Sequence, residues 1–574
     1  MKGWGVGRLG KNRPVLAIVL HSHLPWVMGC GRWPFGEEWI YEIAWSCYIP
    51  LVRCFRSLAR EGIPANVTVS ITPVLAQQLA SDAFKRGFVE YLEDRVRRVG
   101  EDRAAFLADG RTELARLTFW MEDQVRLAIS EFEAMGYDLP GAFASLAQAG
   151  MIELATSAAT HGYLPLLKHD KSRRLQVRMG RIMFTEIFDV EPKGFWFPEC
   201  AYRPGLEQLV VDEGYDYTVL DAMAVQGGRA MSHYGESTRE EPSTGRSVDR
   251  LYRCRDSRLV IFPRHPELCA QVWSKWTGYP GDFAYREFHK QNPRSGMRYH
   301  RVTDSAGSLA TKQPYDPVTA VARAKEHAAH FVAQVEATAA KSRAESPVFT
   351  TAFDTELYGH WWFEGPVFLG EVARLMHQSD GVRLATCSQI LAGAGAGADA
   401  GVGADAGVGA DAGVGADAGP GQDATPLQRI EPLESSWGVN CDHSVWMNER
   451  TKPMWEKIWE LEDVVNGSWL LTPFGPWPGD FWDLQGHVDE FLREFLLMMG
   501  SDWEFLMYTG TAGDYPKRRF EGHRRKCAEA YARLQRVLSD EYLPAYTYEP
   551  SELAEPAESA ESGQEDSEST GKCE

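Results

Sequence analysis

The sequence predicts an α/β protein in which short buried strands alternate with helices, as in a barrel. Three observations support this prediction. Short apolar runs bounded by turn residues recur along the chain, as at residues 15–20 and 347–353, and such runs are typical of strands buried in a parallel sheet. Helical patterns separate them. Two of the runs are followed within two residues by an acidic residue, at the strand edge that carries the chemistry in barrels of this kind.

Seven runs are predicted to be strands. In chain order they cover residues 15–20, 65–74 with its turn, 152–157, 194–197, 217–221, 259–262 and 347–353. A helix is expected to begin at Asp316-Pro317, since Asp can cap the first amides and Pro suits the first helical position. Its apolar stripe is expected to comprise Val318, Val321, Ala322, Ala324, Ala328, Phe331 and Val335.

Composition changes along the chain predict its division into segments. Residues 1–390 are expected to form the barrel, with a helical insertion at about 80–148 and a polar loop at about 227–250 that is either disordered or a lid. Residues 391–425 form a Gly/Ala/Asp repeat expected to be a flexible linker. A helical C-terminal domain is expected at 426–548, and an acidic disordered tail at 549–574.

The bulk composition limits the classes of partner. A formal net charge of −20 argues against nucleic acid, which needs clustered Lys and Arg. The sequence has no uninterrupted apolar stretch of about 18 residues, so no membrane-spanning helix is predicted. The apolar run at 15–20 is too short for the apolar region of a secretory signal. Ten scattered cysteines fit reduced thiols, so we expect a cytoplasmic protein. The 19 Trp, 21 Tyr and 26 Phe suit sugar ligands, although most such rings belong to cores.

Histidines lie where predicted strands give way to loops. His21 follows the first strand and His161 follows the third. Since His21 and His23 are separated by a single residue, we expect at most one of them to face a given site. Alternating histidines can bind a metal, but no further His, Cys or acidic cluster lies nearby in the sequence. We therefore expect no metal.

Two carboxylates stand at strand ends beside aromatic residues. Glu199 follows the strand at 194–197, and Asp354 follows the strand at 347–353. Glu199 alone could equally be the acidic start of a helix. Two carboxylates at the ends of different strands are the arrangement expected of glycoside chemistry, in which one is ionised and the other carries a proton.

Five motifs resemble those of glycoside hydrolase family 57, and specifically its 1,4-α-glucan branching enzymes. They are His21-Ser22-His23-Leu24-Pro25, residues 159–163, residues 196–202, residues 353–362, and Trp437-Gly438 with residues 442–446. The resemblance runs from about residue 14 to about 540, apart from the linker. It implies an incomplete (β/α)7 barrel with a helical insertion and a helical C-terminal domain. It also implies a retaining mechanism with no metal or cofactor.

The resemblance also implies roles for individual residues. Glu199 is similar to the family's nucleophile and Asp354 to its general acid/base. The residues similar to those that hold glucan are His21, His161, Tyr234, Arg264, Trp273, Gly281, Trp437, Trp446 and Asp502. Thr511 stands where members often have Gln. The implied partner is an α-1,4-glucan of the amylose or glycogen kind, as donor and acceptor, and the protein is expected to be a monomer or homodimer.

Three other functions fit parts of this pattern. An α-amylase or 4-α-glucanotransferase would use the same scaffold with water or a 4-hydroxyl as acceptor. A glucan-binding protein without catalysis would keep the rings and not need the carboxylates. A metal-dependent deacetylase would use His21 and His23.

Overall fold

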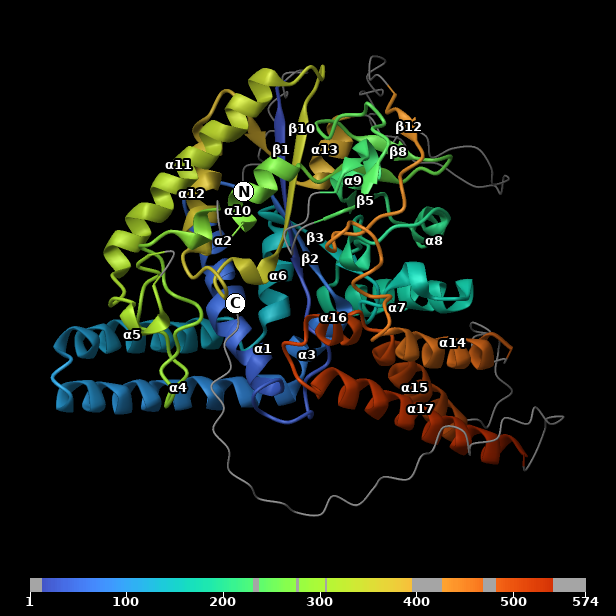
Figure 1. Ribbon diagram of the computed structural model, residues 1–574, viewed down its shortest axis with the longest axis horizontal. Coiled ribbons are helices and arrows are strands. Elements are labelled where there is room, and N and C mark those ends of the chain that lie inside the picture. The colour runs from blue at the N-terminus through green and yellow to red at the C-terminus, as the bar shows by residue number, and fades with distance from the viewer. Residues whose placement is uncertain are drawn as a thin grey trace, which may run out of the picture.

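The computed structural model describes residues 13–230, 237–274, 278–304, 307–394, 426–467 and 482–539. Parallel strands form its centre and lie in the middle of Figure 1. These strands are β1 (Val15–Ser22), β2 (Val67–Ile71), β3 (Ile152–Ser157), β4 (Phe195–Trp196), β5 (Tyr217–Leu220), β9 (Val260–Pro263) and β10 (Val348–Asp354). Each of the seven predicted strands is present.

Parallel pairing connects these strands in the order β10-β1-β2-β3-β4, and β5 pairs with β9. The two groups meet at isolated parallel bridges between Gly194 and Tyr217 and between Arg264 and Thr350. These two joins are single bridges rather than ladders, so the barrel is incomplete. The α/β barrel prediction is thereby confirmed.

The residues of β1 alternate between two hydrophobic clusters. Leu16, Ile18 and Leu20 belong to one cluster, whereas the alternate residues Val15, Ala17 and Val19 belong to the other. Successive side chains of a strand point to opposite faces, so both faces of β1 are covered by protein. This is why the strand reads as one continuous apolar run.

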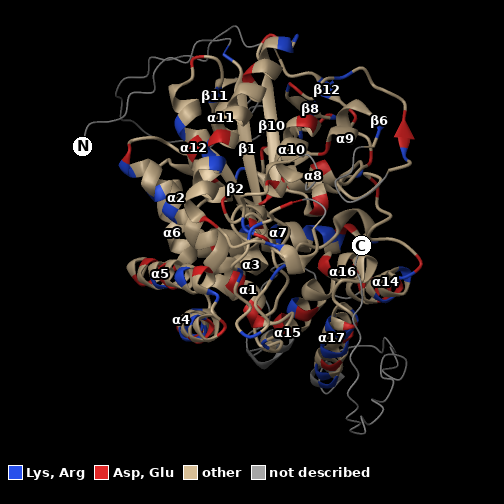
Figure 2. Cartoon of the chain, turned by 60° about the vertical axis from the view of Figure 1, so that its left-hand side comes forward, with Lys and Arg blue, Asp and Glu red and all other residues tan. Residues whose placement is uncertain are grey.

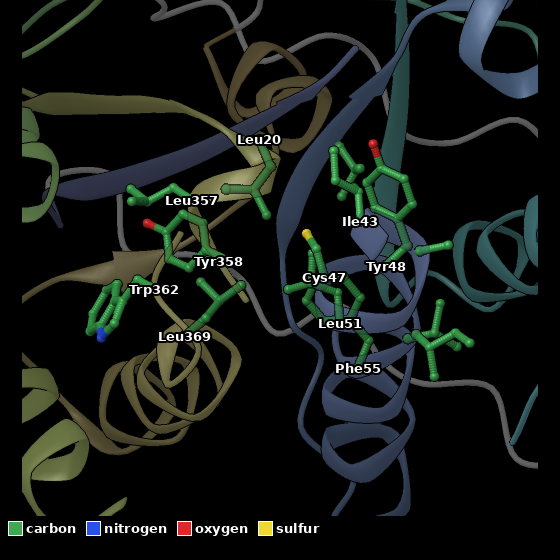
Figure 3. Packing of buried hydrophobic residues seen from close by; sticks show 14 of the residues in the cluster. Leu20, Ile43, Cys47, Tyr48, Leu51, Phe55, Leu357, Tyr358, Trp362 and Leu369 are labelled. Atoms are coloured by element: carbon green, nitrogen blue, oxygen red, sulfur yellow. The ribbon is translucent and has the colours of Figure 1, made fainter. Parts of the chain in front are cut away.

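The helices α1 (Glu37–Ile43), α2 (Ile49–Arg60) and α12 (Gly365–Gln378) supply much of the first cluster. Figure 3 shows Leu20 of β1 lying between Cys47 and Tyr48 on one side and Leu357 and Leu369 on the other. Cys47 and Tyr48 come from a π-helical turn, Ala44–Tyr48, that joins α1 to α2. The packing therefore links the first strand to helices from both ends of the barrel segment.

The barrel segment also contains further helices and short strands. The helices are α3 (Pro73–Ala80), α7 (Asp170–Phe188), α8 (Leu206–Asp212), α9 (Ala222–Gln226), α10 (Pro266–Trp273), α11 (Pro317–Lys341) and α13 (Cys387–Gly393). The strands are β6 (Gly228–Arg229), β7 (Glu240–Glu241), β8 (Tyr252–Cys254) and β11 (Arg383–Leu384).

Between β2 and β3 the chain forms three successive helices beyond α3. They are α4 (Asp82–Ala108), α5 (Thr112–Ala134) and α6 (Leu139–Gln148). In Figure 1, α4 and α5 lie side by side and project away from the strands at the lower left. Arg103 of α4 donates a hydrogen bond to Thr118 of α5 at 3.1 Å, which helps to hold the pair together.

Helix α11 begins where predicted, because the Asp316 side chain accepts a hydrogen bond from the Val318 amide at 3.1 Å. Its predicted stripe was wrong in the first turns. Val318 is 79% exposed and Val321 38% exposed, and Ala322 is also exposed. The buried face instead comprises Ala320, Ala324, Ala328, Phe331, Val332 and Val335. The buried face therefore follows Ala320, Ala324 and Ala328, and Val318, Val321 and Ala322 lie outside it.

The C-terminal region begins with β12 (Arg429–Ile430), which pairs with β8. Among the described residues of this region, the helices that follow are α14 (Lys452–Gly467), α15 (Trp482–Met498), α16 (Asp502–Thr509) and α17 (Tyr515–Ser539). They gather at the lower right of Figure 1. Antiparallel bridges between Tyr202 and Ser435 and between Gly162 and Gly500 attach this region to the loops after β4 and β3.

Charged residues lie mainly on the outer helices. Figure 2 shows β1 and β10 almost free of Lys, Arg, Asp and Glu, whereas both signs of charge follow α4 and α17. Within the described ranges, no helix is both long and apolar enough to cross a membrane. Residues 395–425 of the expected linker and the whole expected tail at 549–574 lie outside the described residues.

Candidate active site

Glu199 stands on a tight turn directly after β4. Its φ is 62° and its ψ is 25°, and Cys200 follows with a φ of 49°. Left-handed backbone is uncommon for residues with a side chain, and it costs energy that surrounding contacts must offset. Such conformations cluster at functional sites. The turn leaves the Glu199 side chain at the C-terminal edge of the strands, 14% exposed.

Two hydrogen bonds hold the Glu199 carboxylate, one on each oxygen. The Trp437 indole Nε1–H donates to Oε2 at 2.8 Å, and the Ser501 hydroxyl donates to Oε1 at 2.7 Å. Burial raises the pKa of Glu199, whereas these two donors act in the opposite direction because they stabilise the ionised form. The site therefore holds a desolvated carboxylate in a defined orientation.

Asp354 is the last residue of β10 and lies opposite His21 of β1 in the strand register. The pKa of Asp354 is raised well above its ordinary value, first by burial and then by the charges of Glu356 and Glu199. The Arg264 guanidinium acts in the opposite direction. The surroundings of Asp354 therefore favour its protonated form more than water does.

Three histidines stack at the same edge. The His21 and His161 Nε2 atoms are 3.0 Å apart, and the His23 ring stacks on His161 with 3.9 Å between centroids. His21 also stacks on Trp196 at 4.5 Å. The expectation that His21 and His23 would not share a site was wrong. Residues two apart in a strand project from the same face, so both rings reach His161.

Arg264 and Asp221 form a buried ion pair beside the carboxyl groups. Arg264 Nη1 donates to Asp221 Oδ2 at 3.0 Å, and their side chains are 6% and 10% exposed. The guanidinium lies 5.4 Å from the Trp437 ring centroid. Its Nε donates to the Ala352 carbonyl oxygen at 3.3 Å, two residues before Asp354. Arg264 thus brings positive charge to the end of β10.

The other residues that resemble glucan-binding residues of the family differ in how far they are buried. Asp502 begins α16, and its Oδ2 lies 2.8 Å from His23 Nε2. The Trp273 ring at the end of α10 meets Trp361 edge to face at 5.9 Å, and Trp361 is 40% exposed. Gly281 ends a short turn, Tyr279–Gly281.

Two further residues lie at the extremes of exposure. Trp446 is 1% exposed and stacks on Tyr163 at 4.5 Å, so its ring is part of the core in this structure. Thr511 is exposed, and its hydroxyl lies 3.0 Å from that of Thr509. Tyr234, on the polar loop predicted at about 227–250, lies outside the described residues.

Sequence reasoning missed Ser501 and Glu356. Ser501 directly precedes Asp502, which resembles a glucan-binding residue of the family, but no local pattern connects Ser501 to Glu199, 302 positions away. Glu356 lies two residues after Asp354, within the motif at 353–362, and this proximity in sequence could have indicated that it belongs to the site. It is 5% exposed, accepts a hydrogen bond from the Tyr48 hydroxyl, and has its pKa raised to about 7, mainly by burial.

Across the part of the chain that the structure describes, no group of three or more His, Cys, Asp or Glu is arranged to hold a metal ion. His21 and His23 instead contact protein groups. The Ser70 hydroxyl lies 3.1 Å from His21 Nδ1, and the Thr72 hydroxyl lies 3.0 Å from His23 Nδ1. Both rings are thereby oriented by β2 and the residue that follows it.

Comparisons with known proteins agree with this architecture. Residues 17–396 match the model of glycosyl hydrolase family 57, and residues 484–550 match the model described as "1,4-alpha-glucan branching enzyme, C-terminal". A 1,4-alpha-glucan branching enzyme of Thermococcus kodakarensis is 35% identical over 528 residues, which cover 89% of this chain and 72% of that protein. A probable 1,4-alpha-glucan branching enzyme of Mycobacterium tuberculosis is 30% identical over 89% of this chain and 90% of that protein.

Solved structures extend the similarity to three dimensions. The crystal structure of a family 57 branching enzyme from Thermococcus kodakaraensis, in complex with glucose and additives, superposes with a TM-score of 0.80. It is 34% identical in sequence, and the superposition covers 92% of each chain. The chain belongs to glycosyl hydrolase family 57.

Proposed function

We propose that the protein is a retaining 1,4-α-glucan branching enzyme acting on a glycogen-like glucan. The observation that carries the proposal is the contrast between two carboxyl groups at one edge of the barrel. Glu199 is held by two hydrogen-bond donors, whereas the surroundings of Asp354 favour its protonated form. Retaining glycoside chemistry needs one carboxylate to attack and one carboxylic acid to protonate. Both named relatives are described as branching enzymes, known or probable.

In the first step, a Glu199 oxygen attacks the anomeric carbon of an α-1,4-linked glucan. The bond from that carbon to the leaving 4-oxygen breaks, and Asp354 gives its proton to this oxygen. The products are a glucan ester on Glu199 and a free 4-hydroxyl on the released chain. Trp437 and Ser501 keep the attacking carboxylate in a fixed orientation before the reaction.

In the second step, the Asp354 carboxylate removes the proton from a 6-hydroxyl of an acceptor chain. That oxygen attacks the anomeric carbon, the ester bond breaks and the Glu199 carboxylate is restored. The new bond is an α-1,6 branch. Water in place of the 6-hydroxyl would give hydrolysis, so aromatic side chains beside the site and Tyr234 on its loop are proposed to hold an acceptor chain and exclude water.

Product linkage tests this proposal. Wild type, Glu199→Gln and Asp354→Asn are incubated with amylose, and new α-1,6 bonds are measured by proton NMR and by enzymatic debranching. Glu456→Gln on α14, whose side chain is 52% exposed, serves as the matched control. We expect α-1,6 bonds from wild type and control, and loss of turnover of roughly 10⁴-fold or more in Glu199→Gln.

Other outcomes would support the other functions. Reducing ends without new branches would indicate an α-amylase, and altered α-1,4 chain lengths without branches would indicate a 4-α-glucanotransferase. Glycogen binding with no turnover, unaffected by Glu199→Gln, would indicate a binding protein. Each of these results would overturn the branching proposal.

A further inference from the structure

A continuous chain of hydrogen-bonding groups leads from β2 to the Glu199 carboxylate. Ser70 Oγ lies 3.1 Å from His21 Nδ1, and His21 Nε2 lies 3.0 Å from His161 Nε2. His161 Nδ1 then lies 2.9 Å from Ser501 Oγ, which donates to Glu199 Oε1 at 2.7 Å. Each of the four linking residues is at most 2% exposed, so the chain is closed to solvent.

The chemistry of the groups sets the direction of every bond. An ionised carboxylate only accepts, so the single hydroxyl hydrogen of Ser501 must point to Glu199. Ser501 Oγ can then only accept from His161, which places a hydrogen on His161 Nδ1. In a neutral imidazole the other nitrogen is an acceptor. His161 Nε2 therefore accepts, and His21 must donate from its own Nε2.

The same logic continues to the start of the chain. With its hydrogen on Nε2, His21 accepts at Nδ1 from the Ser70 hydroxyl. Burial lowers the pKa of both His21 and His161, which agrees with two neutral rings. All the donors thus point toward Glu199. Hydrogen bonds aligned in this way polarise one another, so the bond that reaches the carboxylate is strengthened.

We propose that Ser501 is a positioning residue, whose hydroxyl orients the Glu199 carboxylate and sets the tautomers of His161 and His21. This inference rests on the proposed role of Glu199 as the nucleophile. Ser501 is 0% exposed, so it acts through Glu199 and not on the glucan.

Backbone hydrogen bonds fix the position of Ser501 beside His161. Its amide donates to the His161 carbonyl oxygen at 3.1 Å, and the adjacent residues Gly162 and Gly500 form an antiparallel bridge. The C-terminal region is therefore docked directly on the loop that carries His161. Without the hydroxyl, Glu199 Oε1 would keep His161 Nδ1 at 3.8 Å as a neighbour, which is beyond hydrogen-bond distance. The carboxylate would then be held on Oε2 alone.

Branching kinetics across pH test the role of the hydroxyl. Ser501→Ala removes it, Ser501→Thr restores it, and Ser257→Ala is the matched control. Ser257 is also buried, and its hydroxyl donates to the Cys254 carbonyl oxygen at 2.6 Å, before the start of β9 at the opposite end of the strand from the site.

For Ser501→Ala we expect kcat to fall roughly 10- to 100-fold, the usual effect of losing one hydrogen bond to a charged group. We expect KM to change little. The acidic limb of the kcat/KM profile should move to higher pH, because the ionised form of Glu199 loses a donor. Ser501→Thr should recover most of both properties, and Ser257→Ala should leave both unchanged. A wild-type profile in Ser501→Ala would overturn the inference.

Neutron diffraction of the wild-type protein in D2O tests the tautomers without any substitution, and decides the matter if Ser501→Ala does not fold. We expect deuterium on His161 Nδ1, on His21 Nε2 and on the Ser501 hydroxyl pointing to Glu199. Deuterium on His161 Nε2 and His21 Nδ1 would overturn the inference. The proposed function is tested by a different result. Full activity of Glu199→Gln would exclude Glu199 as the nucleophile, whichever tautomers the two histidines adopt.

Discussion

The Trp437 indole donates a hydrogen bond to the Glu199 carboxylate at 2.8 Å, although the two residues are 238 positions apart. The Trp437 backbone amide also donates to the Glu199 carbonyl oxygen, at 3.0 Å. One residue of the C-terminal region therefore holds both the main chain and the side chain of the proposed nucleophile. The predictions below follow from this attachment and from the charges around it.

Trp437→Phe should lower kcat roughly 10- to 100-fold, because it removes one hydrogen bond to a charged group and keeps an aromatic ring facing Arg264. The acidic limb of the kcat/KM profile should move to higher pH, since the ionised form of Glu199 loses a donor. Trp459→Phe is the control, because its indole donates only to the Leu166 carbonyl oxygen, at 2.9 Å. Equal effects of the two substitutions would contradict this account.

Glu356→Gln should move the alkaline limb of the kcat/KM profile to lower pH. The negative charge of Glu356 raises the pKa of Asp354, so its removal makes the proton of the proposed general acid easier to lose. Gln keeps an oxygen that can accept from the Tyr48 hydroxyl. Glu364→Gln is the matched control, since Glu364 is also buried and accepts from the Tyr315 hydroxyl at 2.6 Å. An alkaline limb that stays in place in Glu356→Gln would refute the coupling.

Glu356 should also make stability depend on pH. Its pKa in the folded protein is about 7, against an ordinary value of 4.5. The folded state therefore holds the proton more tightly, and the free energy of unfolding falls as pH rises from about 4.5 to about 7. This rise in pKa corresponds to a fall of about 3 kcal/mol in the free energy of unfolding. Urea unfolding across that range should give a smaller fall in Glu356→Gln than in wild type, and parallel curves would count against the prediction.

Arg264→Met should lower the free energy of unfolding by about 3–5 kcal/mol, because it leaves the buried Asp221 carboxylate without its partner. Arg518→Met is the comparison on the surface. Its partner is Asp514, and the two side chains are 69% and 73% exposed, so the loss should be under about 1 kcal/mol. Urea denaturation of both variants measures the difference. Losses of similar size would mean that the Arg264 pair is not a buried pair in solution.

Tyr234→Ala should raise the ratio of hydrolysis to branching. We expect the Tyr234 ring to cover the glucan ester and exclude water, so its removal lets water compete with the 6-hydroxyl. Counting reducing ends and α-1,6 bonds in the same reaction measures the ratio. Tyr234→Phe keeps the ring and should stay close to wild type. A Tyr234→Ala enzyme with an unchanged ratio would exclude this role.

Local patterns were sufficient for the strands and for the placement of the two carboxylates. A strand covered on both faces, such as β1, is apolar along its length, so a run of consecutive apolar residues is sufficient to predict its position. Glu199 and Asp354 could be placed at strand ends for the same reason. Local pattern failed where exposure depends on a distant partner. Val318 and Val321 of α11 fit an apolar stripe, but no element covers them sufficiently to bury them.

The sequence by itself determined the seven strands, the two acidic strand ends and the start of α11, because each depends on neighbours within a few residues. Only the tertiary structure decided what surrounds those acidic groups. The bonds from Trp437 and Ser501 to Glu199 span 238 and 302 positions. Their geometry depends on how the C-terminal region docks against the barrel. No short stretch of residues encodes that docking, because its free energy comes from surfaces that meet only after the chain has folded.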